Sequence, residues 1–353
     1  MPTEKIVVPD APRIPGLSFR SFRGEADYPA MVAVIESSKV VDGIERVASV
    51  EEVARSYQHL SNCDPYRDML FVEVEGQVVA YSRVWWWEEA AGNRLYGHFA
   101  SLLPEWRGKG IRRVMVRHNE RRLREVAASH PAGTPRFFET WASDTETHWE
   151  SLLLSEGYDA ARHRFGMIRP TLDDIPDLPL PKSLEIRPVQ PKQIRLVWNA
   201  AKEAFQDALG YSEDDWSDAR FELWKADPLL RPELWQVAWD GDEVAGMVLN
   251  YIIDEENQTY GRSRGYTSVI CTRRPWRRRG LARALLARSL KLLKEQGMNE
   301  AGLNVDAENP TGAIQLYRGM GFQVAKRTTA YHKPLTDIQG GERNVNKANN
   351  RGA

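Results

Sequence analysis

Hydrophobic spacing along residues 184–335 switches repeatedly between strand and helix periods. Alternation around the turn Asp240-Gly241-Asp242 is typical of two hairpin strands, and apolar residues at three- and four-residue intervals before Gly297 predict an amphipathic helix. The predicted strands cover 184–189, 234–253, 265–272, 300–305 and 321–335, the last as one strand or a pair, and the predicted helices cover 191–209, 280–296 and 310–320. This order predicts an α/β (α+β) fold with a mixed sheet flanked by helices.

The same landmarks occur twice along the chain, in the same order and 164–170 residues apart. They are LSFRSF at Leu17 and LEIRPV at Leu184, the turns at Gly76 and Gly241, the basic motifs at Gly110 and Gly280, and the segments ending near Gly157 and Gly321. We therefore predict two copies of one fold, 17–168 and 184–335. Residues 1–16 form an N-terminal extension, the proline-rich 169–183 a linker and the polar 336–353 a disordered tail.

Composition excludes several classes of protein. Lys and Arg number 48 against 49 Asp and Glu, and this near-neutral balance argues against a polycation that coats nucleic acid or anionic membrane. Apolar runs are too short for a membrane helix, and the N-terminus lacks the pattern of a targeting peptide. Cys63 and Cys271 indicate neither a disulfide framework nor a metal site. We expect a cytoplasmic monomer or homodimer without a metal.

The segment between the strand 265–272 and the helix at Gly280 carries an unusual density of positive charge. Its arginines are Arg273, Arg274, Arg277, Arg278 and Arg279. A helix N-terminus already has positive character, so these arginines favour a site for a multiply charged anion such as a phosphate. The alternative is a solvated basic loop beside a glycine that starts a helix. Neither the Walker pattern nor the three-glycine dinucleotide fingerprint is present.

The run Arg277-Arg278-Arg279-Gly280-Leu281-Ala282 resembles the Arg/Gln-x-x-Gly-x-Gly/Ala motif of the GNAT acyl-CoA N-acyltransferases. The following NVDAENPTGAIQLYRGMGF resembles that family's next strand, Asn-containing turn, short helix and Gly-Phe ending. Because both halves carry the resemblance, the chain looks like a tandem GNAT protein, similar in arrangement to mycothiol synthase. The resemblance implies acetyl-CoA as co-substrate and acetyl transfer to an amine.

The resemblance also implies roles for individual residues. Backbone N–H groups of the motif would bind the coenzyme A pyrophosphate, and the residues that carry this over are Arg278, Arg279, Gly280, Leu281, Ala282 and Arg283. Ile270, Cys271 and Thr272 would pair with the pantetheine arm and offer an oxyanion donor. Asn309 is predicted either as a helix cap before Pro310 or as a coenzyme A contact. Tyr317 is either a core tyrosine or the acid that protonates the departing thiolate.

The first copy departs from the family pattern at three positions. Arg112 stands where the motif has Gly or Ala, Leu153 where the second copy has Tyr317, and Thr145 where it has Asn309. Leucine cannot donate a proton. We therefore predict a degenerate, non-catalytic first domain that completes the acceptor pocket or the domain interface.

The acceptor amine and its base are less well defined. Asp306 and Glu308 are candidate bases, and Tyr266 and Ser268 share a strand face on which they could order a water. A covalent acyl-enzyme at Cys271 is disfavoured, because no histidine lies nearby in sequence to activate the thiol.

Two further features bear on the acceptor pocket. Trp85, Trp86 and Trp87 alternate faces if they lie on a strand, where they form either core or a pocket wall. The second feature is an acidic stretch, which either favours a cationic amine or begins a helix: Glu213, Asp214, Asp215 and Asp218.

Three functions follow from these features. The first is direct transfer, in a ternary complex, from acetyl-CoA to a small-molecule amine in the second domain. The second is a mycothiol-synthase-like acetylation of an amino-thiol conjugate. The third is a non-catalytic acyl-CoA-binding module.

Overall fold

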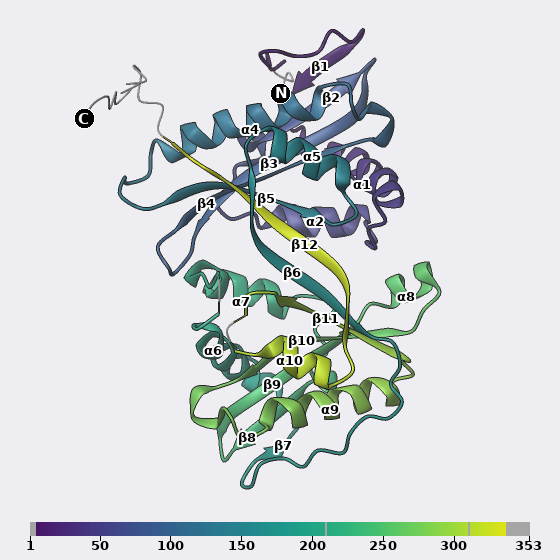
Figure 1. Ribbon diagram of the computed structural model, residues 1–353, viewed down its shortest axis with the longest axis vertical. Helices are drawn as coiled ribbons and strands as arrows, with labels where there is room; N and C mark the ends of the chain where they lie inside the picture. Colours follow the sequence, from purple (N-terminus) through teal and green to yellow (C-terminus); the bar gives the residue numbers. More distant parts are fainter. Residues whose placement is uncertain (1–4, 209, 310, 337–353) are drawn as a thin grey trace, which may run out of the picture.

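A computed structural model describes residues 5–208, 210–309 and 311–336, and its strands form one continuous sheet. Two halves lie along the long axis of the molecule, with β6 and β12 running between them (Figure 1). The strands, in sheet order, are β1 (Leu17–Arg20), β2 (Met69–Val74), β3 (Gln77–Glu88), β4 (Arg94–Leu102), β5 (Arg136–Ser143), β12 (Gln323–Pro334), β6 (Asp159–Arg169), β11 (Glu300–Asp306), β10 (Arg264–Thr272), β9 (Glu243–Ile252), β8 (Gln236–Asp240) and β7 (Glu185–Ile186). The mixed α/β architecture predicted from the sequence is confirmed.

The helices divide between the two halves. The first half contains α1 (Tyr28–Asp42), α2 (Val50–Gln58), α3 (Pro65–Asp68), α4 (Ile111–Ala127) and α5 (Thr147–Ser155). The second half contains α6 (Ile194–Phe205), α7 (Asp218–Lys225), α8 (Asp254–Tyr260), α9 (Leu281–Glu295) and α10 (Ala313–Gly319). Of the predicted linker 169–183, Arg169 is the last residue of β6, and residues 170–183 contain neither helix nor strand.

The closing strands of the two halves are exchanged. By the sequence repeat, β6 ends the first copy and β12 the second. In the sheet, β6 pairs with β11 of the second half, and β12 pairs with β5 of the first. The two strands also pair antiparallel with each other. Neither half of the sheet is therefore complete without a strand from the other, which ties the two halves together through backbone hydrogen bonds.

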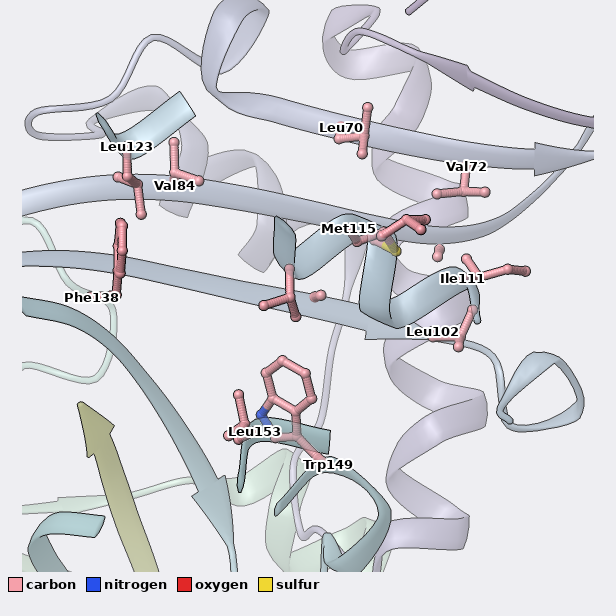
Figure 2. Close-up of a cluster of buried hydrophobic side chains, with 14 of the residues drawn as sticks. Leu70, Val72, Val84, Leu102, Ile111, Met115, Leu123, Phe138, Trp149 and Leu153 are labelled. Carbon is pink, nitrogen blue, oxygen red and sulfur yellow. The ribbon is translucent and has the colours of Figure 1, made fainter. Parts of the chain in front are cut away.

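Side-chain alternation along each strand decides which helix covers which face. In β2, Met69 and Phe71 pack on the face covered by α1 and α2, whereas Leu70 and Val72 pack on the face covered by α4. Figure 2 shows Leu70 and Val72 in one cluster with Ile111 of α4. The second half repeats this arrangement, with α6 and α9 on opposite faces of β9. Each half is therefore a sheet between two layers of helices.

Two local predictions are wrong. The strand predicted over 184–189 shortens to Glu185–Ile186. The helix predicted over 310–320 begins at Ala313, after Gly312 in the left-handed conformation, so Asn309 is not its cap. Instead, Asn309 Oδ1 accepts a hydrogen bond from the backbone N–H of Thr311 at 2.9 Å. Pro310 and the predicted tail from 337 lie outside the described residues.

No helix within the described ranges is long and apolar enough to cross a membrane.

Candidate functional site

The strands β10 and β11 separate partway along their length. They are paired only from Arg264 to Tyr266. On its other side, β10 loses its register with β9 between Ser268 and Cys271, where Val269 has a φ of 46°. A positive φ is strained for a β-branched residue, and such outliers concentrate at functional sites. The separation and the bulge leave an open wedge beside the C-terminal end of β10.

The predicted basic motif lies at the mouth of this wedge. Gly280 precedes α9 with a φ of 81°, a conformation that glycine adopts without a steric penalty. A side chain at this position would meet no atom within 4 Å, so the backbone at the helix start is bare. Arg278 has a φ of 62°, which is unfavourable for any residue with a Cβ. The first turn of α9 therefore presents its unpaired N–H groups to the wedge.

The arginines of the motif divide into two sets. Arg273 forms an ion pair with Glu203 at 2.7 Å, and Arg277 forms one with Asp207 at 2.8 Å. Arg274 also pairs with Asp207, whose pKa these guanidinium groups hold well below its ordinary value. These three arginines fasten the motif to the end of α6, so the expectation that all five await an anion is wrong for them.

The second set consists of arginines without an ion-pair partner in the described part of the chain. They are Arg278, Arg279 and Arg283, all with exposed side chains. Positive charge that no protein carboxylate neutralises is therefore concentrated at the start of α9, where the helix N-terminus adds to it.

A cavity of about 1000 Å³ joins the wedge to the motif. Nearly all of the predicted cofactor-binding residues line it: Ile270, Cys271, Thr272, Arg278, Gly280, Leu281, Ala282, Arg283 and Asn309. Arg279 is the exception and is not part of the lining. Aromatic side chains that the sequence did not single out as pocket residues form the opposite wall, namely Phe205, Tyr211, Trp216 and Tyr251.

Tyr317 reaches this cavity from α10. Its ring is buried against Phe322, and its hydroxyl has no hydrogen-bond partner among the described residues. Burial raises the pKa of Tyr317 to about 12, so the hydroxyl keeps its proton at neutral pH. Cys271 also lines the cavity, and burial raises its thiol pKa to about 12. A thiol that stays protonated is a poor nucleophile, which agrees with the prediction against an acyl-enzyme.

The candidate bases differ in whether their carboxylates already have a hydrogen-bond or ion-pair partner. Glu308 accepts a hydrogen bond from the backbone N–H of His163 at 3.2 Å. Asp306 lines the cavity but lies 3.5 Å from the guanidinium of Arg164. Asp215 lines the cavity without an ion pair in the described chain, and desolvation raises its carboxyl pKa. Of these carboxylates, Asp215 is therefore the one best placed to accept a proton.

The two residues predicted to order a water separate. Ser268 lines the cavity, but Tyr266 does not. The Tyr266 hydroxyl donates a hydrogen bond to Glu256 at 2.6 Å and accepts one from Arg262. Tyr266 is therefore occupied in holding α8 against the sheet.

The tryptophan run belongs to the first half and does not line the large cavity. Trp85 and Trp87 stack on one face of β3 with ring centroids 6.3 Å apart, and Trp86 meets His130 on the other. The predicted alternation of faces is confirmed, and the three rings pack within the first half.

The first half nevertheless supports the wall of the large cavity. The hairpin between β3 and β4 donates a hydrogen bond from the Ala90 N–H to the carbonyl of Tyr211 at 2.8 Å. Arg162 of β6 pairs with Glu89 in that hairpin at 3.0 Å and also lies against Gly210. The segment that carries Tyr211 is thus braced by residues of the first copy.

The equivalent wedge in the first half is filled by side chains. Arg112 points inward, donates a hydrogen bond to the carbonyl of Ala100 at 2.7 Å and stacks 3.9 Å over Trp149. Leu153 is fully buried, and Figure 2 shows it with Trp149 in the core cluster. Arg112, which stands where the motif has Gly or Ala, therefore turns its side chain into the wedge.

Comparison with known proteins agrees with this geometry. The model of the acetyltransferase (GNAT) family matches residues 198–322, all within the second half. A mycothiol acetyltransferase of Geodermatophilus obscurus is 26% identical over 305 residues, which cover 84% of this chain and 91% of the relative. The N-alpha-acetyltransferase MAK3 of Arabidopsis thaliana is 33% identical over 103 residues, 29% of this chain and 52% of the relative.

Two solved structures share the whole arrangement. A GCN5-related N-acetyltransferase from Sphaerobacter thermophilus superposes with a TM-score of 0.68 and 27% identity, covering 93% of this chain and 97% of that one. A tandem GNAT protein from the clavulanic acid biosynthesis pathway gives 0.62 with 14% identity over 90% and 98%, a likeness of fold alone. Residues 198–322 therefore form a GNAT acetyltransferase domain, and over most of its length the chain is similar to acetyltransferases of this family, which supports an acyltransferase.

Proposed function

We propose that the second half, residues 184–335, transfers an acetyl group from acetyl-CoA directly to a small-molecule amine in a ternary complex. One observation carries this proposal. A single cavity brings together the bare start of α9, the unpaired edge of β10 and the hydroxyl of Tyr317. These are the three groups that phosphate binding, thioester orientation and thiolate protonation require.

The start of α9 suits the pyrophosphate of coenzyme A. Backbone N–H groups from Gly280 to Arg283 face the cavity, and the helix dipole contributes about half a positive charge. Arg278 and Arg279 add unpaired guanidinium groups on the approach to this helix start. Because Arg273, Arg274 and Arg277 are already held in ion pairs with Glu203 and Asp207, the arginines nearest the bare backbone remain to meet the anion.

The edge of β10 suits the extended arm and the thioester. Beyond Tyr266, no described strand pairs with β10 on the side of β11, and the bulge removes Val269 and Ile270 from register with β9. Backbone groups at Ile270 are therefore free to hydrogen-bond to an extended ligand. A preorganised N–H donor to the developing oxyanion is worth about 2.7–4 kcal/mol in the transition state.

Proton transfer completes the mechanism. Asp215 accepts a proton from the ammonium form of the acceptor, which frees the lone pair of the amine, and its raised pKa makes it a better base than an ordinary aspartate. The amine attacks the thioester carbonyl, the tetrahedral intermediate collapses, and the carbon–sulfur bond breaks. Tyr317 donates its proton to the departing thiolate, and the extra proton on the nitrogen of the new amide restores the Tyr317 hydroxyl. Buried, protonated Cys271 takes no covalent part in this proposal.

The test is a thiol-release assay with acetyl-CoA and a panel of primary amines. Replacement Tyr317→Phe removes the proton donor but keeps the ring, so we expect turnover to fall about 100-fold while acetyl-CoA affinity changes less than about threefold. Tyr66→Phe, at an exposed tyrosine of the first half, is the matched control and should leave turnover unchanged. Equal turnover in Tyr317→Phe and the parent protein would remove Tyr317 as the acid.

A second candidate acceptor is an amino-thiol conjugate, as expected for a mycothiol-synthase-like enzyme. The match to mycothiol acetyltransferases along most of both chains supports it. The same assay decides between the candidates when the panel includes cysteinyl-amine conjugates beside simple amines. Acetyl-CoA binding without thiol release for any amine would instead support the non-catalytic module.

A further inference from the structure

The first half contains a cavity of its own, of about 250 Å³, at the place that corresponds to the large cavity of the second half. It opens beside β4 and the start of α4. Its walls include four aromatic residues, Tyr81, Phe99, Trp141 and Trp149. The charged residues of its lining are Lys39, Asp42, Arg46, Arg107, Arg112 and Glu146.

Arg112 is the deepest of these charged groups. Its Nε donates to the carbonyl of Ala100, and its guanidinium plane lies on the ring of Trp149. The two Nη atoms have no hydrogen-bond partner among the described residues and remain accessible, while the side chain as a whole is partly buried. Burial lowers the pKa of Arg112 to about 10, so the group stays charged at neutral pH. The open Nη atoms of Arg112 can therefore donate a pair of hydrogen bonds to an anion that enters the cavity.

The other charged groups of the lining already have partners. Both oxygens of Asp42 accept hydrogen bonds from Arg107 at 2.7 Å. Lys39 pairs with Glu36.

Arg46 and Glu146 complete the charged lining of the cavity. Arg46 lies at the rim, 3.9 Å from Glu52. Glu146 accepts the backbone N–H of Ser143, and burial raises its carboxyl pKa, which weakens it as a counter-ion for Arg112. Asp42 and Glu146 attract Arg112 through space, but neither accepts a hydrogen bond from its Nη atoms, so these donors stay open to a ligand.

We propose that this cavity binds a small carboxylate with a flat apolar body, held by the fork of Arg112 between the aromatic walls. Arginine presents paired donors that match the two oxygens of a carboxylate, and the surrounding rings favour a planar apolar group. The volume equals that of about eight water molecules, which fits a ligand of the size of benzoate. Acetyl-CoA is too large, since Arg112 and Trp149 fill the space that the second half keeps open.

The experiment is a calorimetric titration of the full chain with benzoate, and with benzamide as the neutral isostere. We expect saturable binding of one benzoate per chain, and binding of benzamide at least about tenfold weaker, because only the anion pairs with the guanidinium. Arg112→Met should weaken benzoate about tenfold or more. Arg113→Met, at the next residue of α4 with an exposed guanidinium, is the matched control and should bind within about twofold of the parent.

Three results would overturn the proposal. One is the absence of saturable benzoate binding up to about 10 mM, a concentration at which even weak specific sites fill. Another is equal affinity for benzamide, which needs no variant and so holds even if Arg112→Met fails to fold. The third is inorganic phosphate binding more tightly than benzoate, which would assign the cavity to a phosphate group. Acetyl-CoA turnover serves as a fold check, since Arg112 lies outside the proposed catalytic cavity.

Discussion

The two halves hold their basic motifs in the same way but differ in what fills the space beside them. Gly110 and Gly280 both precede a long helix in the left-handed conformation. The first arginine of each motif is fastened to an aspartate at the end of the first long helix, Arg107 to Asp42 in the first half, and Arg277 to Asp207 in the second. This repeated ion pair is structural, so the presence of the motif arginine does not by itself indicate coenzyme A binding.

The difference lies in three pairs of equivalent positions. Where the second half has Ala282, Ala313 and Tyr317, the first has Arg112, Trp149 and Leu153. The two small residues leave open a cavity of about 1000 Å³, whereas their large counterparts reduce it to about 250 Å³. We infer that side-chain volume beside the motif decides which half can admit acetyl-CoA.

Backbone strain separates the halves as well. Gly108 has a φ of 75°, and at the equivalent position Arg278 has a φ of 62°. Glycine takes this conformation freely, but a residue with a Cβ pays about 1–2 kcal/mol. The second half keeps a strained arginine where the first half has the relaxed residue, which is consistent with a role for the Arg278 side chain in the ligand-binding state.

The largest expected difference between the halves concerns two carboxylates whose pKa values burial raises, Asp215 and Glu146. Asp215→Asn should lower kcat/KM about 100-fold, because it removes the proposed base. In the parent protein kcat/KM should fall as the pH drops through the raised pKa of Asp215. This acidic limb of the pH profile should vanish in Asp215→Asn. Glu146→Gln is the control and should keep the acidic limb of the pH profile. A loss of that limb in Glu146→Gln would show that the base lies in the first half.

A smaller effect is expected when the second wedge is made to resemble the first. In Ala282→Arg the new side chain can fold into the cavity as Arg112 does, so we expect the KM for acetyl-CoA to rise about tenfold or more. The acceptor KM should change less. An unchanged KM for acetyl-CoA in steady-state kinetics would show that volume at this position does not control entry.

The smallest effect concerns the strained arginine. Arg278→Gly introduces the glycine that the first half has at the equivalent position. Relief of backbone strain in the folded state offsets the added entropy of the unfolded chain, so the free energy of unfolding should change by less than about 1 kcal/mol in either direction. The KM for acetyl-CoA should rise about threefold to tenfold, since one unpaired charge is lost near the phosphates. Denaturant unfolding and steady-state kinetics measure the two quantities, and a KM below that of the parent would contradict the role given to Arg278.

The sequence predicted the parts of this comparison that depend on local pattern. The duplication, the positions of Gly280 and Tyr317, and the substitution of Leu153 all follow from motif spacing. Partners distant in sequence did not follow: Asp207 neutralises Arg277 across 70 residues, a pairing set by how α6 packs on the sheet. The exchange of β6 and β12 could not be predicted either, because the sheet edge that each strand joins is set by partners distant in sequence. The prediction of Asn309 as a helix cap was wrong. An Asn before a Pro is typical of a helix start, but α10 begins after Gly312.

The central claim is that only the second half binds acetyl-CoA. Its most direct test is the stoichiometry of acetyl-CoA binding, measured by calorimetry on the parent chain and on the variants Ala282→Arg and Arg112→Met. The account predicts one molecule per chain in the parent and in Arg112→Met, and binding weakened about tenfold or more in Ala282→Arg. Two molecules per chain, or binding lost in Arg112→Met and kept in Ala282→Arg, would contradict it.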